Sequence, residues 1–371
     1  MITQVLIDGL RGCRILPVMK AVILVGGEGT RLRPLTCNTP KAMVPVLNRP
    51  FLEHVVNYLK GHGIVDIILA TGQQFGQIQD YFGDGGEFGV RLTCSVEDFP
   101  RGTAGAVKKA EKFLDGPFVV FNGDIFTRLD LTAMLSFHRE KKPVATIALT
   151  PVEDPTIYGV VETDEQGRVR CFTEKPKRDE VTTNMINAGL YIVEPCLLDH
   201  ITPDTFFSFE HDVFPLLLEK GQAIYGFPTE AYWIDIGTPE KYRRLNCDLL
   251  LRDIKGVRFD GESSVHPSAR ISAPAVVGAG CSIGKDSVVK GPVVIGPGCR
   301  IGEGATVEGA VLWQDCEIGS GAKLRNCVIA SGCCIEPRSE IGDNCVLGDN
   351  VTVAPETRLP EGIMVWPAKY R

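Results

Sequence analysis

Features that mark several other classes of protein are absent from this sequence of 371 residues. No apolar run reaches the roughly 18 residues that a membrane-spanning helix needs. The formal net charge of −7 disfavours a broad nucleic-acid-binding surface. The histidines show neither a metal-ligand spacing nor an arrangement with serine or cysteine that indicates a nucleophilic triad. We therefore expect neither a membrane nor a nucleic acid as partner.

Cysteine is plentiful, but its arrangement does not indicate disulfide bonds. The 13 cysteines are odd in number and form no Cys-x-x-Cys pair, so we expect reduced thiols in a cytoplasmic protein. Residues 1–18 contain Asp8 and basic residues that interrupt the apolar stretches, unlike a secretory signal peptide. Because Met19 directly precedes the first convincing strand, we expect residues 1–18 to be an extension of unknown order.

The most informative segment is KAVILVGGEGTRLRPLT at residues 20–36, which Pro40-Lys41 follows. An apolar strand over 21–25 leads into a glycine-rich turn and then into two arginines. Glycines let the backbone approach a ligand closely, and consecutive backbone N–H groups after a strand can hold an anion. The arginines and Lys41 supply the positive charge that a polyphosphate needs. The segment therefore predicts a nucleotide site.

The segment does not match two common nucleotide motifs. G-x-G-x-x-G requires glycine where Leu32 stands, and G-x-x-x-x-G-K-[ST] requires a lysine that is absent at its spacing. The segment instead resembles the signature of the sugar-nucleotidyltransferases (nucleoside-diphosphate-sugar pyrophosphorylases), G-G-x-G-T-R-L-x-P-L-T with a downstream P-K. This resemblance implies transfer of a nucleotidyl group from a nucleoside triphosphate to a sugar 1-phosphate, with release of pyrophosphate. The nucleotide contacts it implies here are Val25, Gly26, Gly27, Gly29, Thr30, Arg31 and Lys41.

Strand-like and helix-like segments alternate over residues 19–245. The predicted strands are 21–25, 66–70, 91–96, 118–121, 144–150, 159–163 and 189–193. The predicted helices are 51–62, 75–82, 103–112, 131–141 and 209–219. Alternation of this kind predicts an α/β domain, a Rossmann-like, doubly wound, mostly parallel sheet. Ligands of such sheets bind at the carboxyl ends of the strands, where the glycine-rich turn would lie.

From about residue 260 an aliphatic residue recurs at every sixth position and is often followed by glycine. One series is Val265, Ile271, Val277, Ile283, Val289, Ile295, Ile301 and Val307. A second series is Ile329, Ile335, Ile341, Leu347, Val353 and Leu359. This period is the hexapeptide signature of a parallel β-helix. The spacing slips near residues 312–317 and again near Val328.

The two parts divide the chain at a predicted linker helix over residues 246–259, with the β-helix over 260–371. The family resemblance implies that this β-helix is left-handed. Its stacked surface favours self-association, so we expect a homo-oligomer formed through it. An acyltransferase site is disfavoured because the repeats contain a single histidine, His266.

Two carboxylates are candidates for metal binding. Asn122-Gly123-Asp124 directly follows the apolar segment 118–121, and Asp235 lies in the string WIDIGT. Carboxylates together with phosphate oxygens are the usual surroundings of Mg²⁺. In the family that the sequence resembles, the Asp of a G-D motif and the Asp of a W-x-D-x-G motif hold the catalytic metal. The resemblance therefore assigns Mg²⁺ to Asp124 and Asp235.

Three further strings point to the sugar phosphate. By resemblance, Lys175 of an E-K-P motif contacts the phosphate, and its neighbour Glu174 hydrogen-bonds sugar hydroxyls. Asn187 opens an N-A-G string that supports the sugar in the family, as an amide that donates and accepts together can do. The pair Tyr158-Gly159 corresponds to a family position near the sugar. With Arg31, Lys41 and Asp124, Lys175 completes the predicted catalytic group.

The string EDFPRGTAG resembles the nucleobase loop of the family and contributes Glu97, Gly102 and Thr103. Guanine presents two adjacent donors that a carboxylate such as Glu97 could accept, which favours GTP. The surrounding sequence looks closest to mannose-1-phosphate guanylyltransferases, so mannose 1-phosphate is the expected second substrate.

Two alternatives stay open. A glucose-1-phosphate thymidylyl- or uridylyltransferase would bind a base with one donor between two acceptors, which an amide matches better than a carboxylate. A non-catalytic regulatory subunit that senses sugar nucleotides would share the two-part layout. Decay of Arg31, Lys41, Asp124 or Lys175 would mark such a sensor, and all four are present.

Overall fold

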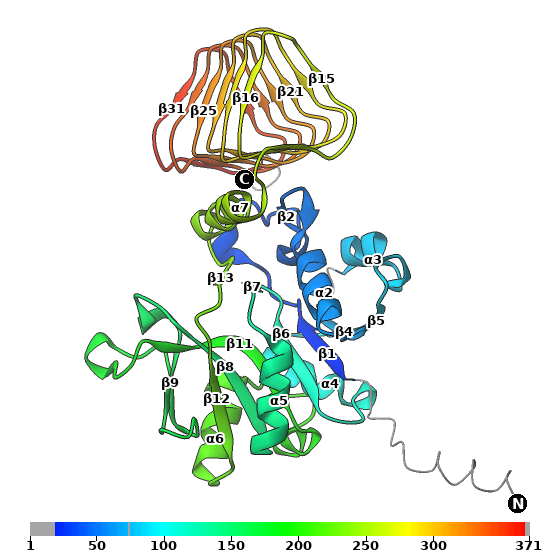
Figure 1. Cartoon of the computed structure of the whole chain (residues 1–371), viewed down its shortest axis with the longest axis vertical. Helices are drawn as coiled ribbons and strands as arrows, with labels where there is room; N and C mark the ends of the chain where they lie inside the picture. The colour runs from blue at the N-terminus through cyan, green and yellow to red at the C-terminus, as the bar shows by residue number, and fades with distance from the viewer. Residues whose placement is uncertain (1–18, 73–74, 368–371) are drawn as a thin grey trace, which may run out of the picture.

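The structure is a computed structural model that describes residues 19–72 and 75–367. It has two parts, an α/β part and a prism of stacked strands that lies directly against it (Figure 1). The predicted extension at residues 1–18 lies outside the described residues. No helix in the described ranges is long and apolar enough to span a lipid bilayer.

The α/β part is built on a mixed nine-stranded sheet with the main order β10-β9-β11-β6-β1-β4-β5. Its strands are β1 (Lys20–Leu24), β4 (Asp66–Thr71), β5 (Arg91–Val96), β6 (Phe118–Asn122), β8 (Ala145–Pro151), β9 (Gly159–Thr163), β10 (Val169–Glu174), β11 (Met185–Val193) and β12 (Ile224–Pro228). Strands β6, β1, β4 and β5 pair in parallel, as predicted, whereas β11 pairs antiparallel with β6, β8 and β9. Short ladders join β2 (Pro45–Val46) to β3 (Arg49–Pro50) and β7 (Ile125–Thr127) to β13 (Trp233–Asp235).

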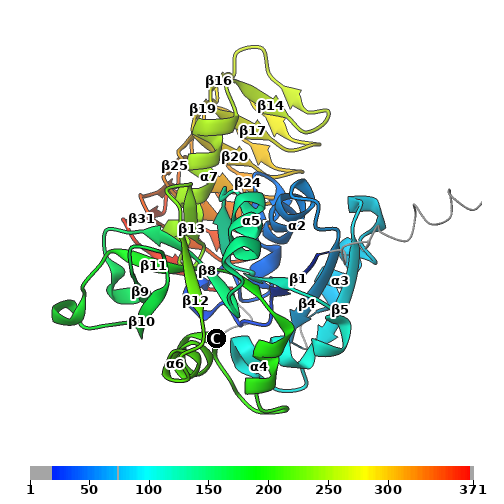
Figure 2. The same cartoon turned by 60° about the horizontal axis from the view of Figure 1, so that its bottom comes forward.

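Helices cover both faces of this sheet (Figure 2). They are α2 (Phe51–Gly61), α3 (Gly76–Phe82), α4 (Gly102–Lys109), α5 (Leu131–Lys141), α6 (Phe214–Glu219) and α7 (Pro239–Asp253). Side chains alternate across a strand, so Ala21 and Ile23 of β1 join the core beneath α2 and α5, while Val22 joins the core beneath α4 and α6. The helix predicted over 209–219 is a π-helical turn (Phe209–Val213) followed by α6.

The second part is a parallel β-helix of three sheets. The first sheet holds β14 (Val257–Phe259), β17 (Ala275–Val277), β20 (Val293–Ile295), β23 (Val311–Leu312), β26 (Val328–Ile329), β29 (Val346–Leu347) and β32 (Met364–Val365). The second holds β15 (Ser264–Val265), β18 (Ser282–Ile283), β21 (Arg300–Ile301), β24 (Glu317–Ile318), β27 (Cys334–Ile335) and β30 (Thr352–Val353). The third holds β16 (Arg270–Ser272), β19 (Val288–Lys290), β22 (Thr306–Glu308), β25 (Lys323–Arg325), β28 (Glu340–Ile341) and β31 (Arg358–Leu359).

The glycine that often follows an inward aliphatic residue has a steric cause. A Cβ on Gly296 would lie 2.4 Å from the backbone of Trp313 in the next coil, and one on Gly278 would lie 2.4 Å from Pro297. Most stacked neighbours are 18 residues apart, but Arg300 and Glu317 are 17 apart. The shorter coils explain the slips in the sequence period.

The predicted linker helix over 246–259 is placed wrongly. Helix α7 begins at Pro239, after Thr238 caps it by accepting a hydrogen bond from Lys241 N at 3.3 Å, and it ends at Asp253. Proline at the first helical position and threonine at the cap favour this earlier start. Strand β14 (Val257–Phe259) already pairs with β17, so the β-helix begins inside the predicted linker.

Candidate active site

The glycine-rich turn lies where the carboxyl ends of four parallel strands meet. Val25 N donates to Ala70 O at 2.8 Å, and Gly123 N donates to Leu24 O at 3.0 Å, so the ends of β1, β4 and β6 are aligned. Gly26 and Gly27 are exposed there. Gly29 has φ 62° and precedes a short 3₁₀ helix, Thr30–Leu32, and glycine favours this left-handed backbone. The turn presents exposed backbone at the edge where the sequence predicts a ligand.

Lys41 and Asp124 meet at this edge. Lys41 Nζ lies 2.6 Å from Asp124 Oδ2, and the two side chains are 14% and 32% exposed. Asp124 reaches this position because a glycine follows β6: a Cβ on Gly123 would lie 2.5 Å from Leu24 O. Two residues that are distant in the sequence therefore form a short, partly open ion pair beside the glycine-rich turn.

Asp235 stands next to Asp124 across the β7–β13 ladder. Asp235 pairs with Ile125, and Ile236 N donates to Asp124 O at 2.9 Å. Arg31 closes the group, because its Nη2 atom would lie 3.6 Å from a Cβ on Gly237. The structure thus brings both predicted metal ligands and Arg31 together.

Lys241 is a site residue that the sequence analysis missed. It forms an ion pair with Asp235 Oδ2 and donates to Tyr158 Oη at 2.6 Å, while Tyr158 donates to Asp235 Oδ2 at 2.6 Å. Burial alone would raise the pKa of Asp235, but the hydrogen bonds from Lys241 and Tyr158 bring it below its ordinary value. A lysine in the first turn of a helix is unfavourable because it opposes the helix dipole. The position of Lys241, shortly after Asp235 in the sequence, could therefore have indicated that it has a role other than stabilising the helix.

The donor set at Asp124 and Asp235 fits a divalent cation. Carboxylate oxygens are the hard ligands that Mg²⁺ prefers, and Mg²⁺ usually takes one or two carboxylates and completes its shell with water and phosphate oxygens. In this structure each of the two carboxylates forms an ion pair with a lysine. The two negative charges of the site are therefore balanced by two positive charges. Nowhere in residues 19–72 and 75–367 do three or more His, Cys, Asp or Glu side chains cluster as a complete metal cage.

The predicted sugar-phosphate residues lie on β9–β11 and connect to this group through Tyr158. Lys175 N donates to Tyr158 O at 2.9 Å, and Glu174 pairs with Gly159 across the β9–β10 ladder. The Lys175 side chain is 64% exposed and lies 3.3 Å from Glu174 Oε1. Lys175 is therefore free to turn toward a ligand, while its backbone is held beside Tyr158.

Asn187 lies on β11 with its amide already engaged. Its Nδ2 donates to Tyr191 Oη at 2.8 Å, and its Oδ1 accepts from Gly189 N at 2.9 Å. Nearby, Asn122 Oδ1 is buried and has no hydrogen-bond partner among the described residues. Asn187 in this structure orders the strand, and Asn122, which the sequence analysis did not select, offers the open acceptor.

The predicted nucleobase residues flank the other side of the turn. Glu97 is 8% exposed, and burial raises the pKa of its carboxyl group. Its Oε1 accepts from Arg101 N at 3.2 Å, and its Oε2 would lie 3.1 Å from a Cβ on Gly26. Gly102 has φ 72° and begins α4. Glu97 and Gly26 therefore meet at one edge of the sheet.

Thr103 leads to a second residue that the sequence analysis missed, Glu210. Thr103 Oγ1 donates to Glu210 Oε2 at 2.8 Å, and Tyr191 Oη donates to Glu210 Oε1 at 3.0 Å. Since Tyr191 also accepts from Asn187, Glu210 joins the predicted base loop to the predicted sugar strand. The string around Glu210 carries no motif that could have revealed this role.

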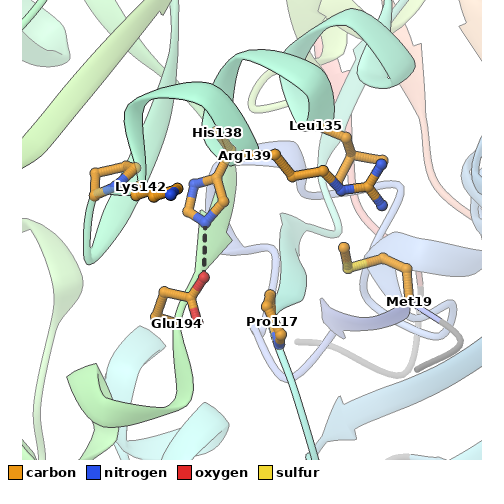
Figure 3. Close-up of a pocket in the computed structure, with 8 residues that line it drawn as sticks. Met19, Pro117, Leu135, His138, Arg139, Lys142 and Glu194 are labelled. Carbon is orange, nitrogen blue, oxygen red and sulfur yellow. Dashed lines mark hydrogen bonds and ion pairs between the residues drawn. The ribbon is translucent and has the colours of Figure 1, made fainter. Parts of the chain in front are cut away.

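A cavity of about 430 Å³ lies at the opposite, amino-terminal edge of β1 and β6 and contains none of the predicted site residues (Figure 3). His138 contributes to its wall, with Nε2 3.2 Å from Glu194 Oε1 and Nδ1 2.8 Å from Thr146 Oγ1. Burial lowers the pKa of His138, although the hydrogen bond to Glu194 opposes the shift. This histidine is a satisfied core residue rather than part of the candidate site.

Models of known protein families match both parts of the chain. A family model described as nucleotidyl transferase matches residues 20–251, and one described as the EIF2B subunit epsilon LbH domain matches residues 258–359. The second match confirms the left-handed β-helix that the hexapeptide period and the resemblance predicted.

Individual relatives are similar over much of the chain. A mannose-1-phosphate guanylyltransferase of Mycobacterium tuberculosis is 40% identical over 276 residues, which are 71% of this chain and 76% of the relative. A UTP–glucose-1-phosphate uridylyltransferase of Synechocystis sp. is 37% identical over 257 residues, 66% of each chain. The crystal structure of HddC from Yersinia pseudotuberculosis complexed with GMP-PN has a TM-score of 0.54 and 32% identity, and the match covers 62% of this chain and 98% of that one.

Proposed function

We propose that this chain, which belongs to the nucleotidyl transferase family, joins GTP and mannose 1-phosphate to give GDP-mannose and pyrophosphate in the presence of Mg²⁺. The observation that supports it most is the convergence of the exposed glycine-rich turn, Arg31, the Lys41–Asp124 pair and the Asp235–Tyr158–Lys241 group at one edge of the sheet. This edge combines an exposed glycine-rich turn, lysine and arginine side chains, and two carboxylates that can serve as hard-oxygen ligands.

The reaction needs no covalent enzyme intermediate. A phosphate oxygen of mannose 1-phosphate forms a bond to the α-phosphorus of GTP, and the bond from that phosphorus to the bridging oxygen breaks. The electron pair leaves on pyrophosphate. Since the substrate brings its own anionic nucleophile, the protein must position two anions and stabilise the charge that develops between them.

The residues of this chain divide that work by their position. The backbone of the glycine-rich turn, Thr30 and Arg31 bind the triphosphate, because they lie at the exposed edge next to Asp235. Lys41 stabilises charge at the α-phosphate from its place beside Asp124. Lys175, exposed and anchored through its backbone to Tyr158, holds the attacking phosphate.

Asp124 and Asp235 would hold the divalent ion, and the family generally uses such an ion. When bound, Mg²⁺ would neutralise part of the negative charge of the substrate phosphates. Lys41 and Lys241, which contact the two carboxylates, would add positive charge beside the ion.

The choice of guanine as the nucleobase depends on Glu97. The Oε2 atom of Glu97 faces Gly26 of the glycine-rich turn, where it can accept hydrogen bonds from the N–H groups of guanine. The Oε1 atom accepts from Arg101 N and orders the loop. The M. tuberculosis relative is named for guanine and mannose, whereas the Synechocystis relative is named for uracil and glucose. The base and the sugar are therefore the part of the proposal that needs a direct assay.

The test is pyrophosphate release from the purified chain with each of the four NTPs and several sugar 1-phosphates, with Mg²⁺ and then with EDTA. We expect turnover with GTP and mannose 1-phosphate that EDTA abolishes. Turnover confined to UTP or dTTP with glucose 1-phosphate would keep the reaction and overturn the role of Glu97. Nucleotide binding without turnover for any pair would support the regulatory-subunit alternative. Sedimentation velocity of the same sample tests the expected homo-oligomer.

A further inference from the structure

Among the contacts between the β-helix and the α/β part, two flank Lys41 in the sequence. On one side, residues 34–38 lie against the coil that carries Gly348 and Asp349. On the other side, the β2–β3 hairpin (45–50) lies against α7 and β20. Lys41 stands between the two contacts, on the short 3₁₀ helix Lys41–Met43.

The first contact is centred on a buried carboxylate. Asn38 Nδ2 donates to Asp349 Oδ2 at 3.1 Å, and Ser331 N donates to Asp349 Oδ1 at 3.2 Å. Asp349 is 6% exposed, and Asn38 reaches it from the exposed side of the contact. The backbone also comes close, because a Cβ on Gly348 would lie 3.2 Å from Pro34 Cβ. A coil of the β-helix thus fits against the loop that follows the glycine-rich turn.

That loop is tied to the turn itself. Thr36 Oγ1 donates to Gly29 O at 2.7 Å, and Cys37 N donates to Pro34 O at 3.3 Å. A shift of the loop would therefore move the backbone that is proposed to bind the triphosphate.

The second contact fixes the hairpin after Lys41. Leu47 N donates to Asn246 Oδ1 at 3.0 Å, and Asn48 Nδ2 donates to Ile295 O of β20 at 3.0 Å. Tyr242 Oη donates to the carbonyl of Pro45 and accepts from Trp313 Nε1 at 2.9 Å. The tryptophan is in the β-helix and 3% exposed, so this chain of hydrogen bonds runs from the β-helix through α7 to the hairpin.

We propose that the β-helix is a positioning element of the active site, which holds both ends of the segment 34–48 and thereby keeps Lys41 against Asp124. Asp349 is its positioning residue on one side, and Trp313 acts through Tyr242 on the other. Holding a lysine side chain in one place costs conformational entropy. When the backbone on both sides of Lys41 is already fixed, less entropy is lost on placing its ammonium group. The inference rests on the proposed function in one respect only, the action of Lys41 on the nucleotide.

The test compares Asp349→Ala with Asp343→Ala in the full chain. Asp343 is a matched control, because its carboxylate accepts from Arg325 and Asn326 within the β-helix and does not touch the segment 34–48. We expect Asp349→Ala to lower kcat about tenfold, with a smaller change in KM, since misplacing a reacting group by about 1 Å can cost about 100-fold. Hydrogen–deuterium exchange of residues 34–44, measured without substrates, should become faster than in the control.

A rescue separates positioning from loss of stability. The double variant Asn38→Asp/Asp349→Asn exchanges donor and acceptor: the new amide donates toward the loop, and its oxygen still accepts from Ser331 N. We expect it to restore slow exchange and to recover most of kcat. Trp313→Phe keeps the aromatic volume and removes the hydrogen bond to Tyr242, so it tests the other contact if Asp349→Ala does not fold.

Two results would overturn the proposal. One is exchange at residues 34–44 in Asp349→Ala and Trp313→Phe equal to that in Asp343→Ala. The other is faster exchange with kcat within about twofold of the control, which is far below the effect of a misplaced group. If the unaltered chain shows no turnover, the proposed function fails, and the exchange measurement still decides whether the β-helix holds the segment.

Discussion

The substitution Asp124→Asn separates catalysis from folding at this site. The change removes a charge and keeps the shape of the side chain. The Asp124 carbonyl, which accepts from Ile236 N at 2.9 Å next to the β7–β13 ladder, is unaffected. Lys41 Nζ is the hydrogen-bond partner of the side chain, at 2.6 Å. We therefore expect the variant to fold with the same architecture.

The two magnitudes differ enough to be told apart. The ion pair is partly open, with side chains 14% and 32% exposed, and a pair of this kind contributes at most about 1 kcal/mol to stability. By contrast, removing one fixed group that stabilises developing charge costs about 100- to 1000-fold in kcat. Asp124→Asn should therefore lower kcat at least about 100-fold, with only a small drop in Tm.

The assay is pyrophosphate release at saturating substrates, together with thermal unfolding of the same preparations. Asp115→Asn is the matched control, because Asp115 pairs with Lys20 at 2.9 Å at the opposite edge of the same sheet. It should leave kcat unchanged. Turnover of Asp124→Asn within about tenfold of the unaltered chain, with the same dependence on Mg²⁺, would refute both the metal-binding and the catalytic role of Asp124.

Three further outcomes are expected. Lys241→Met leaves the Asp235 carboxylate without its cation, which should lower the free energy of unfolding by about 1–3 kcal/mol, measured by urea unfolding without metal. Mg²⁺ should then raise the Tm of this variant more than that of the unaltered chain. An equal rise would contradict the pairing of Lys241 with Asp235. Because burial raises the pKa of Glu97, its charge is lost at a higher pH than in an exposed glutamate, so KM for GTP should increase on mild acidification. Glu97→Gln should abolish this pH dependence of KM. The same pH dependence in that variant would show that Glu97 does not recognise the base. Gly296→Ala forces a Cβ to 2.4 Å from the next coil and should lower the urea midpoint strongly, whereas Gly256→Ala, with open space around it, should not; equal midpoints would refute the steric account.

The elements that could be predicted well have local causes. The strand 91–96, the strand 159–163 and the helix 131–141 are observed with the predicted bounds, because hydrophobic pattern and turn residues next to them are sufficient. The β-helix was predictable for a related reason: an inward aliphatic residue recurs with a regular period, and a glycine follows it wherever a Cβ would meet the backbone of the next coil. Helix α7 was misplaced because the capping threonine and proline of Thr238-Pro239 were not used as a start signal.

The candidate site was predictable only as a set of motifs. The glycine-rich turn and Asp124 are together because the parallel strands β1 and β6 end at one edge, whereas the antiparallel ladder of β7 and β13 brings Asp235 to them. Lys241 and Glu210 were not foreseen, since their partners are brought to them by the ladder of β13 and by the π-helical turn. A charged residue that functions through a distant neighbour leaves little trace in its own segment.

The sequence by itself determined the class of this protein: a nucleotide turn at the end of an apolar strand and a hexapeptide period both follow from local geometry that few other residues satisfy. Only the tertiary structure decided how the two parts cooperate. The contacts of Asp349 with Asn38 and of Trp313 with Tyr242 join residues that are hundreds or tens of positions apart. Such contacts depend on how the β-helix packs against α7 and the α/β core, and packing between distant segments has no periodic signal along the chain.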